Sequence, residues 1–141
     1  MCFLAKKKME KVVGRCEKIS FTELGLENLN SKIDTGAYGI SIHVDSISVD
    51  DSILKFTIGD KNFEYNKYKI VKIKSSFGER QKRFCIFTRL KMGNSTYKFY
   101  VSLSDRKDMK YPVLVGRRFL HKFNYMVDVR KKYLNDTDKK V

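Results

Sequence analysis

Asp34 carries the clearest chemical signal in the sequence. It lies in the stretch KIDTGAYG, residues 32–39, after the apolar Ile33 and before the small residues Gly36 and Ala37. An Asp followed by Thr-Gly is common in turns, where its carboxylate accepts hydrogen bonds from nearby backbone amides. Two close carboxylates that share one proton have another use, because together they can activate a water molecule and protonate a leaving amine. Asp34 is therefore either a turn former or one half of a catalytic pair.

The second carboxylate of such a pair has to come from another copy of the chain. The sequence contains one Asp-Thr-Gly and neither a second one nor an Asp-Ser-Gly. A pair of Asp34 residues then requires a two-fold axis, with each Asp34 facing its symmetry mate. The catalytic interpretation thus predicts a homodimer.

Composition narrows the class of protein and the kind of partner. The 141 residues fit one domain with a single core, and the formal net charge is +14. Such a charge indicates an acidic partner, either nucleic acid or an acidic peptide, although a low-GC genome also raises the lysine content without a functional reason. The three cysteines show no paired spacing, and no signal peptide or membrane span is evident, so we expect a cytoplasmic protein.

Alternation of apolar and polar residues predicts a protein built of strands. Residues 83–92 and 95–104 alternate on either side of Gly93-Asn94, and 52–58 and 61–65 do so around Gly59-Asp60, which indicates two β-hairpins. Residues 68–74 change phase, which suggests either a bulge near 70 and 71 or a strand buried on both faces. Only 117–123 has a helical pattern. The expected fold is a small closed or sandwich-like β domain with one short helix near its C-terminal end.

Four stretches in order give the sequence a family resemblance: VGRCEKISFTELGL, SKIDTGAYGISIHV, VKIKSSFGERQKRFCIF and LSDRKDMKYPVLVGRRFL. Together they resemble the RimB-like branch of the retropepsin-type aspartic proteases, long labelled ATP-dependent zinc proteases. The resemblance covers residues 12–134 and implies an all-β, retropepsin-like closed barrel. Residues 1–11 are then an N-terminal extension and 135–141 a flexible tail.

The resemblance and the residue types assign three groups of site residues. In the family the Thr of the loop ties two active loops together, and the Gly lets the backbone approach the substrate closely. The catalytic residues predicted in this way are Asp34, Thr35 and Gly36. The predicted substrate-binding residues are Ala37, His43, Lys74, Ser75, Ser76, Arg80 and Arg83. The predicted structural supports are Asp105, Arg106, Asp108, Gly116 and Arg117.

Several of these assignments leave alternatives open. Residues 74–84 form either a solvated hairpin tip or, with Lys72, a basic lining of a cleft for carboxylates. SDRKDM at 104–109 is either a charged turn or a buried Asp-Arg brace. Tyr38 stands where viral retropepsins carry an Asp that pairs with the Arg after the late Gly, so Arg117 needs another partner, Asp105 or Asp108.

A metal or a nucleotide is not expected as a cofactor. His43 has only His121 as a companion, and the sequence has neither a zinc-binding motif nor a glycine-rich phosphate loop. His43 is therefore expected either to make structural hydrogen bonds or to contact the substrate.

Two classes of function remain, together with an inactive form of the same fold. The resemblance implies a peptidase that trims glutamate tails, which an ATP-grasp ligase adds to the C-terminus of a ribosomal protein. The rival is a noncatalytic basic β module that binds RNA or an acidic protein partner. It predicts aromatic residues interleaved with Lys and Arg on an exposed sheet face. Tyr97 and Phe99 offer such interleaving but are expected to face the core.

Overall fold

The structure is a computed structural model that describes residues 11–74, 78–106 and 109–136. Strands dominate it, with one short α-helix and one turn of 3-10 helix at Thr22–Leu24. The strands are β1 (Lys11–Val13), β2 (Cys16–Phe21), β3 (Leu26–Ile33), β4 (Ile40–His43), β5 (Ser46–Asp50), β6 (Ile53–Ile58), β7 (Lys61–Tyr65), β8 (Lys69–Lys74), β9 (Arg80–Met92), β10 (Ser95–Ser104), β11 (Val113–Val115) and β12 (Tyr125–Val127). The helix α1 spans Arg117–Lys122. Among the described residues, no helix has the length and apolar character needed to cross a membrane.

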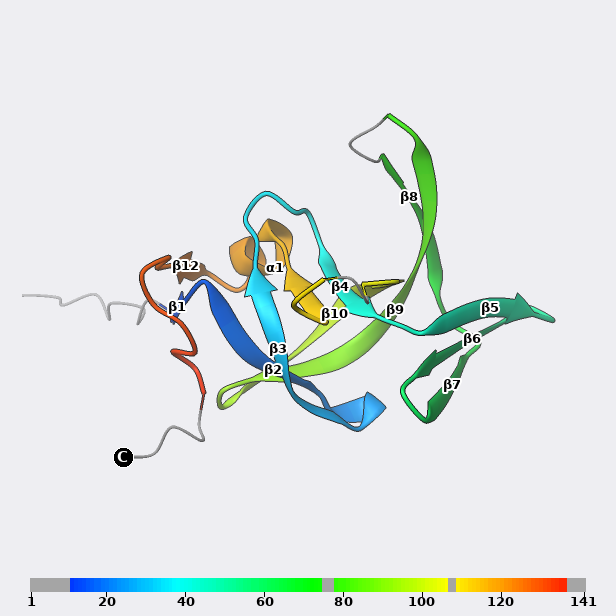
Figure 1. Cartoon of the computed structure of the whole chain (residues 1–141), viewed down its shortest axis with the longest axis horizontal. Helices are drawn as coiled ribbons and strands as arrows, with labels where there is room; N and C mark the ends of the chain where they lie inside the picture. The colour runs from blue at the N-terminus through cyan, green and yellow to red at the C-terminus, as the bar shows by residue number, and fades with distance from the viewer. Residues whose placement is uncertain (1–10, 75–77, 107–108, 137–141) are drawn as a thin grey trace, which may run out of the picture.

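Six strands close into a barrel in the order β10-β4-β11-β3-β2-β9 (Figure 1). The ring is completed where β9 returns to β10 as the long hairpin predicted from the alternating pattern. Within the ring, β11 pairs in parallel with β3 and antiparallel with β4. Closure leaves these six strands without a free edge. The expected retropepsin-like closed β-barrel with one short C-terminal helix is thereby confirmed.

The barrel interior is filled by the alternating apolar residues of its strands. Ile86, Leu90 and Met92 of β9 are almost fully buried, and so are Val101 and Leu103 of β10. Each such side chain contributes about 1.5–3 kcal/mol when it leaves water. The aromatic rings of α1 close one end of the core, where Phe119 packs edge-on against Tyr97 and Phe99. Tyr97 and Phe99 thus face the core, as expected.

A small three-stranded sheet and a hairpin project from the barrel (Figure 1). Strands β5, β6 and β7 form a separate antiparallel sheet, and β8 pairs with the first half of β9. The expectation for β8 was wrong. Its register with β9 is continuous from Lys69 to Lys74, and Ile70 and Ile73 are exposed. The apolar residues change phase because this strand extends beyond the core, where burial no longer imposes one inward face.

Candidate active site

Asp34 lies at the point where β3 ends and the chain crosses to β4. Its backbone amide donates to the carbonyl oxygen of Val115 at 2.8 Å, which ties it to the neighbouring strand β11. Its carboxylate oxygen Oδ1 accepts a hydrogen bond from the amide of Gly36 at 3.0 Å. The side chain is half-buried. Asp34 can therefore be a turn former and hold a fixed carboxylate at the same time, because the hydrogen bond that shapes the turn also orients its side chain.

The start of α1 holds residues 34–39, the segment between β3 and β4 that we call the Asp34 loop. The amides of Gly116, Arg117 and Arg118 donate to the carbonyl oxygens of Gly39, Ala37 and Tyr38, at 2.9, 2.9 and 3.0 Å. The helix has no side-chain cap, so these loop carbonyls satisfy amides that a helix start otherwise leaves unpaired. Loop and helix therefore hold each other in place.

Arg117 contacts the Asp34 loop in a way that the sequence did not predict. Its Nη1 donates to the carbonyl oxygen of Gly36 at 3.1 Å, and its guanidinium lies 5.3 Å from the centre of the Tyr38 ring. Arg118 lies 5.6 Å from the same ring. Arg117 thus contacts a carbonyl oxygen and an aromatic face, which attracts cations through its quadrupole. Of its two expected acidic partners, Asp108 lies outside the described residues.

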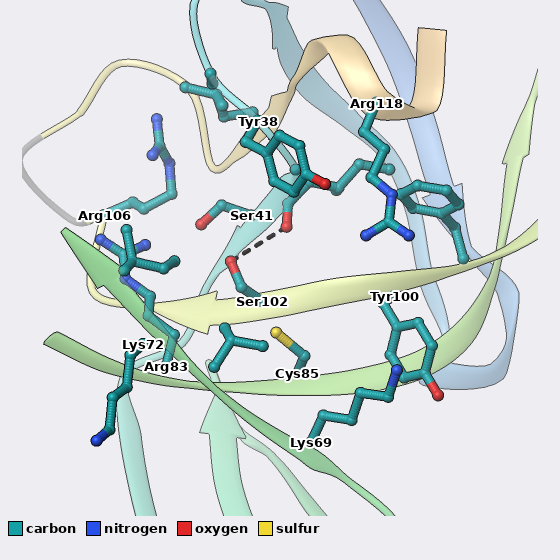
Figure 2. Close-up of a pocket in the computed structure, with 17 residues that line it drawn as sticks. Tyr38, Ser41, Lys69, Lys72, Arg83, Cys85, Tyr100, Ser102, Arg106 and Arg118 are labelled. Carbon is teal, nitrogen blue, oxygen red and sulfur yellow. Dashed lines mark hydrogen bonds between the residues drawn. The ribbon is translucent and has the colours of Figure 1, made fainter. Parts of the chain in front are cut away.

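A cleft of about 590 Å³ opens beside this loop (Figure 2). Its lining residues come from the Asp34 loop, from α1 and Arg106, and from the strands β4, β8, β9, β10 and β11. None of the described lining residues is acidic, and five are basic. These five are Lys69, Lys72, Arg83, Arg106 and Arg118. The cleft is therefore suited to an anionic ligand.

The cleft includes some of the predicted substrate-binding residues. Ala37 and Arg83 line it, and Lys72 does so as well. Lys74 and Arg80 are exposed on the β8–β9 hairpin and are not among the residues that line it. Ser75 and Ser76 lie outside the described residues. Sequence reasoning missed the lining residues Lys69, Tyr100 and Arg118. The alternating pattern of β10 predicts that the Tyr100 side chain points away from the core, and this was the only sequence feature that could have indicated its place in the cleft.

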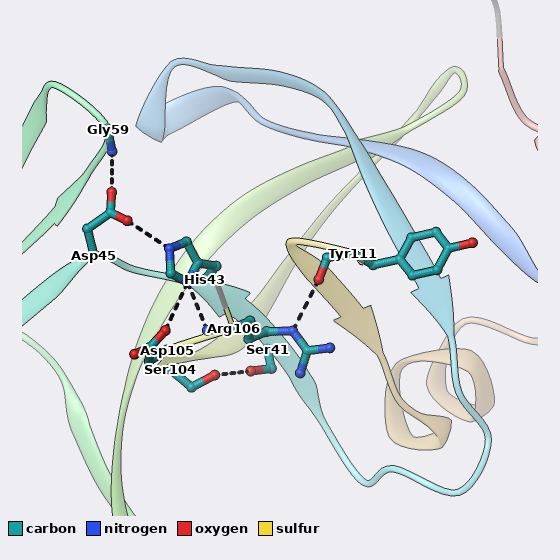
Figure 3. Close-up of polar contacts among 8 residues, drawn as sticks. All are labelled: Ser41, His43, Asp45, Gly59, Ser104, Asp105, Arg106 and Tyr111. Carbon is teal, nitrogen blue, oxygen red and sulfur yellow. Dashed lines mark hydrogen bonds and ion pairs between the residues drawn. The ribbon is translucent and has the colours of Figure 1, made fainter. Parts of the chain in front are cut away.

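His43 makes hydrogen bonds within the chain through both ring nitrogens (Figure 3). Its Nδ1 accepts from the backbone amide of Arg106 at 2.8 Å, and its Nε2 lies 2.8 Å from Oδ1 of Asp45. This requires a neutral ring with the proton on Nε2. The second oxygen of Asp45 accepts from the amide of Gly59, and these contacts lower the pKa of Asp45. His43 thus joins the end of β4 to the β5–β7 sheet.

The predicted Asp-Arg brace has a different form. Asp105 is 62% exposed, and its Oδ1 lies 3.7 Å from Nδ1 of His43, so it is not a buried brace. The Arg106 side chain lies over the cleft, and its Nε donates to the carbonyl oxygen of Tyr111 at 3.4 Å. Consecutive residues of an extended chain point to opposite sides, which separates the two side chains.

The described residues contain no group of three or more His, Cys, Asp or Glu side chains arranged to hold a metal ion. Cys16 and Cys85 are free thiols, and both are buried. Burial raises the pKa of the Cys85 thiol.

Comparison with known proteins agrees with this fold and loop. A six-stranded barrel with an Asp-Thr-Gly loop against its last strand and helix defines the retropepsin-like class. Residues 12–138 match the model of the RimB-like family, described as retropepsin-like aspartic endopeptidase RimB, and the chain belongs to that family. The crystal structure of Lpg0085 from Legionella pneumophila, a protein of unknown function, is similar. The two share 30% sequence identity with a TM-score of 0.72, over 89% of this chain and 98% of that one.

Curated relatives include two proteins named probable alpha-L-glutamate ligase. The protein from Desulfotalea psychrophila is 28% identical over 120 residues, which make up 77% of this chain and 26% of that protein. The protein from Shewanella pealeana is 28% identical over 118 residues, or 75% of this chain and 26% of that protein. The chain therefore spans about a quarter of the length of the curated relatives it matches.

Proposed function

We propose that the protein is an aspartic peptidase that works as a homodimer and cleaves acidic, glutamate-rich tails. The observation that carries the proposal is the position of Asp34, whose oriented carboxylate lies in a loop that borders a cleft in which every charged lining residue among those described is basic. Membership of a retropepsin-like endopeptidase family supports the reaction type.

The chemistry follows from two Asp34 carboxylates that share one proton. The ionised Asp34 removes a proton from water, and the oxygen of that water forms a bond to the peptide carbonyl carbon. The protonated Asp34 of the second copy gives its proton to the carbonyl oxygen. When the tetrahedral intermediate collapses, the first Asp34 passes the proton it took from water to the amide nitrogen, the C–N bond breaks and the amine leaves. A hydroxyl of the intermediate returns its proton to the second Asp34, which leaves the new carboxyl group and restores the pair. Water is consumed, and no metal or other cofactor is required.

The substrate class follows from charge. A glutamate tail carries one negative charge per residue, and the five cations of the cleft together with the net charge of +14 favour its approach. The ligase names of the curated relatives support glutamate as the residue in question, because a segment similar to this chain forms part of those proteins. We place the reaction in the cytoplasm, in agreement with the free thiols of Cys16 and Cys85. The proposal includes a functional link to an ATP-grasp glutamate ligase.

One observation favours the rival function, a basic module that binds RNA. Phe87 and Tyr100 are exposed, and their ring centres lie 4.9 Å apart. Lys69 lies 4.1 Å from the Tyr100 ring and Lys98 lies 6.0 Å from the Phe87 ring. Aromatic rings flanked by cations form a platform on which bases can stack. This platform uses the outward phase of β9 and β10, not Tyr97 and Phe99.

The deciding experiment compares the wild type with Asp34→Asn on a peptide that ends in several glutamates, with products read by mass spectrometry. Asn keeps the size of the side chain and its oxygen acceptor but cannot ionise. Asp60→Asn, in an exposed turn, is the matched control. We expect cleavage by the wild type and by Asp60→Asn, with and without a chelator, and none by Asp34→Asn. Sedimentation should find a dimer for all three proteins.

Equal cleavage by Asp34→Asn would reduce Asp34 to a turn former. No cleavage by any of the three, combined with tight binding of single-stranded RNA, would favour the binding module.

A further inference from the structure

The Arg106 guanidinium has an unusual position in the cleft. Its Nη2 is buried and has no hydrogen-bond partner within the part of the chain that the structure describes. Leaving a buried donor of a charged group unpaired costs free energy, and such a donor is commonly paired by a ligand, an ion or a water molecule. Arg106 lines the cleft, so a turn of its guanidinium toward the cleft would let an acceptor there complete the hydrogen bonds of Nη2.

Arg83 brings a second positive charge to the same place. It projects from β9 into the cleft and is half-buried, and Figure 2 shows its side chain at the same end of the cleft as Arg106. Burial and the charge of Arg83 lower the pKa of Arg106, whereas the charge of Asp34 acts in the opposite direction. Two guanidinium groups that face one space repel each other unless an anion lies between them. Arg106 is therefore within electrostatic reach of both Arg83 and Asp34.

We propose that Arg83 and Arg106 together form the site that binds a carboxylate of the substrate next to Asp34. The inference rests on the proposed function and names the residues that would make it selective for glutamate. An arginine guanidinium binds a carboxylate through two parallel hydrogen bonds, so two guanidinium groups together bind a substrate carboxylate strongly. A substrate glutamine in the same place has one oxygen acceptor and no charge, so it leaves the arginine donors poorly paired.

The carboxylate has two sources in a glutamate tail, the side chain and the chain end. The two share the same chemistry and can be separated with three peptides of equal length. One ends in glutamates with a free C-terminus, one has the same sequence with an amidated C-terminus, and one replaces the glutamates by glutamines. Loss of affinity on amidation assigns the chain end, and loss on replacement by glutamine assigns the side chain.

The test measures binding of these labelled peptides by fluorescence anisotropy, in the Asp34→Asn background so that no peptide is cleaved. We expect Arg83→Gln and Arg106→Gln each to weaken binding of the glutamate peptide about tenfold or more, as expected for charge-assisted hydrogen bonds. Arg106→Lys keeps the charge but loses the fork, so it should fall between the parent and Arg106→Gln.

Arg89→Gln is the matched control for charge. Arg89 lies on the same strand as Arg83 but does not line the cleft, and its side chain is 48% exposed. Its loss should change the affinity by about twofold at most, because exposed charges are screened. Circular dichroism and thermal unfolding establish which variants fold. If Arg106→Gln does not fold, Arg83→Gln and Arg106→Lys still decide the matter.

The outcomes separate this inference from the proposed function. Equal losses in Arg83→Gln, Arg106→Gln and Arg89→Gln would overturn it, because only general charge would then matter. Cleavage by the wild type without any dependence of binding on Arg83 or Arg106 would leave the peptidase standing and remove the inference. Arginine-dependent binding without cleavage would support the carboxylate site and count against the peptidase. No binding of the glutamate peptide by Asp34→Asn would also overturn the inference.

Discussion

The amide of Gly116 donates to the carbonyl oxygen of Gly39 at 2.9 Å, so the loop after Asp34 lies against the backbone that opens α1. This contact is close enough to exclude any side chain at position 116. A Cβ there would lie 2.5 Å from the oxygen of Gly39 and 2.7 Å from that of Ala37, and both are backbone atoms. At Gly39 itself, a Cβ would meet no atom within 4 Å. The two glycines are hydrogen-bonded to each other, yet only at position 116 is there no room for a side chain.

We therefore expect Gly116→Ala to lower the free energy of unfolding by about 2 kcal/mol, because the loop or the helix must shift. Gly39→Ala should change it by less than about 0.5 kcal/mol, as for an ordinary surface substitution. Urea unfolding followed by circular dichroism measures both. Peptide cleavage should also fall in Gly116→Ala, since the displaced loop carries Asp34. Equal stability of the two variants would show that the contact yields without cost.

The regular parts of the fold were predictable because alternation records burial. The hairpins β6–β7 and β9–β10 and the helix α1 each bury one face, so their apolar residues recur with a fixed period. β8 lies outside this rule, since its side chains face solvent or the cleft instead of the core. The parallel pair β1–β12 is three residues long on each side, which is too short to show a period.

The candidate site was predictable mainly where its residues lie close together in the sequence, as in the Asp34 motif and in the basic run that contains Arg83. Asp34, Thr35 and Gly36 are adjacent in the sequence, and so are Gly116 and Arg117. The cleft is assembled instead from β4, β8, β9 and β10, and nothing in the order of residues indicates that Lys69, Arg83 and Arg106 face one space. Asp105 and Arg106 suggested an ion pair because they are neighbours, but their side chains have different surroundings.

Glu17 offers a test of how the C-terminal segment is held to the barrel. It is fully buried, and its carboxylate accepts hydrogen bonds from the amides of Gly14, Leu134 and Asn135 at 2.7, 3.1 and 2.9 Å. Glu17→Gln puts an NH₂ group where an acceptor is needed. We expect a loss of about 2 kcal/mol in the free energy of unfolding, as for hydrogen bonds to a charged group.

Glu27→Gln is the control for this substitution, because Glu27 is exposed on β3. Its unfolding midpoint in urea should match that of the wild type. A midpoint of Glu17→Gln that also matches the wild type would show that the amides of residues 134 and 135 find water instead.

The pH dependence of stability should report the link between His43, Asp45 and Gly59. The amide of Gly59 and the His43 ring lower the pKa of Asp45 below its ordinary value of 3.8. A lowered pKa in the folded state means that the carboxylate contributes stability above pH 3.8, which is lost as the pH falls through the folded value. Wild type should therefore exceed Asp45→Asn in unfolding midpoint at neutral pH, and the difference should shrink below pH 3.8.

Asp60→Asn serves as the reference here, since it removes an exposed carboxylate from the turn between β6 and β7. Its midpoint should follow that of the wild type at each pH. A difference between wild type and Asp45→Asn that persists unchanged into acid would assign the effect to the shape of the side chain and not to its charge.

Salt should weaken cleavage of acidic peptides more than cleavage of neutral ones. The net charge of +14 and the five cations of the cleft attract a glutamate tail at distances beyond direct contact. The Debye length falls as salt is added, to ~8 Å at physiological ionic strength, so this attraction is progressively screened. We expect kcat/KM for a glutamate peptide to fall about tenfold between low and moderate salt, in the range of electrostatically steered association.

A peptide with glutamines at the same positions should be cleaved slowly, with little dependence on salt. Stopped assays analysed by mass spectrometry give both values under identical conditions. If both peptides respond equally to salt, the effect lies in the dimer or in the ionisation of Asp34, because neither depends on the charge of the substrate.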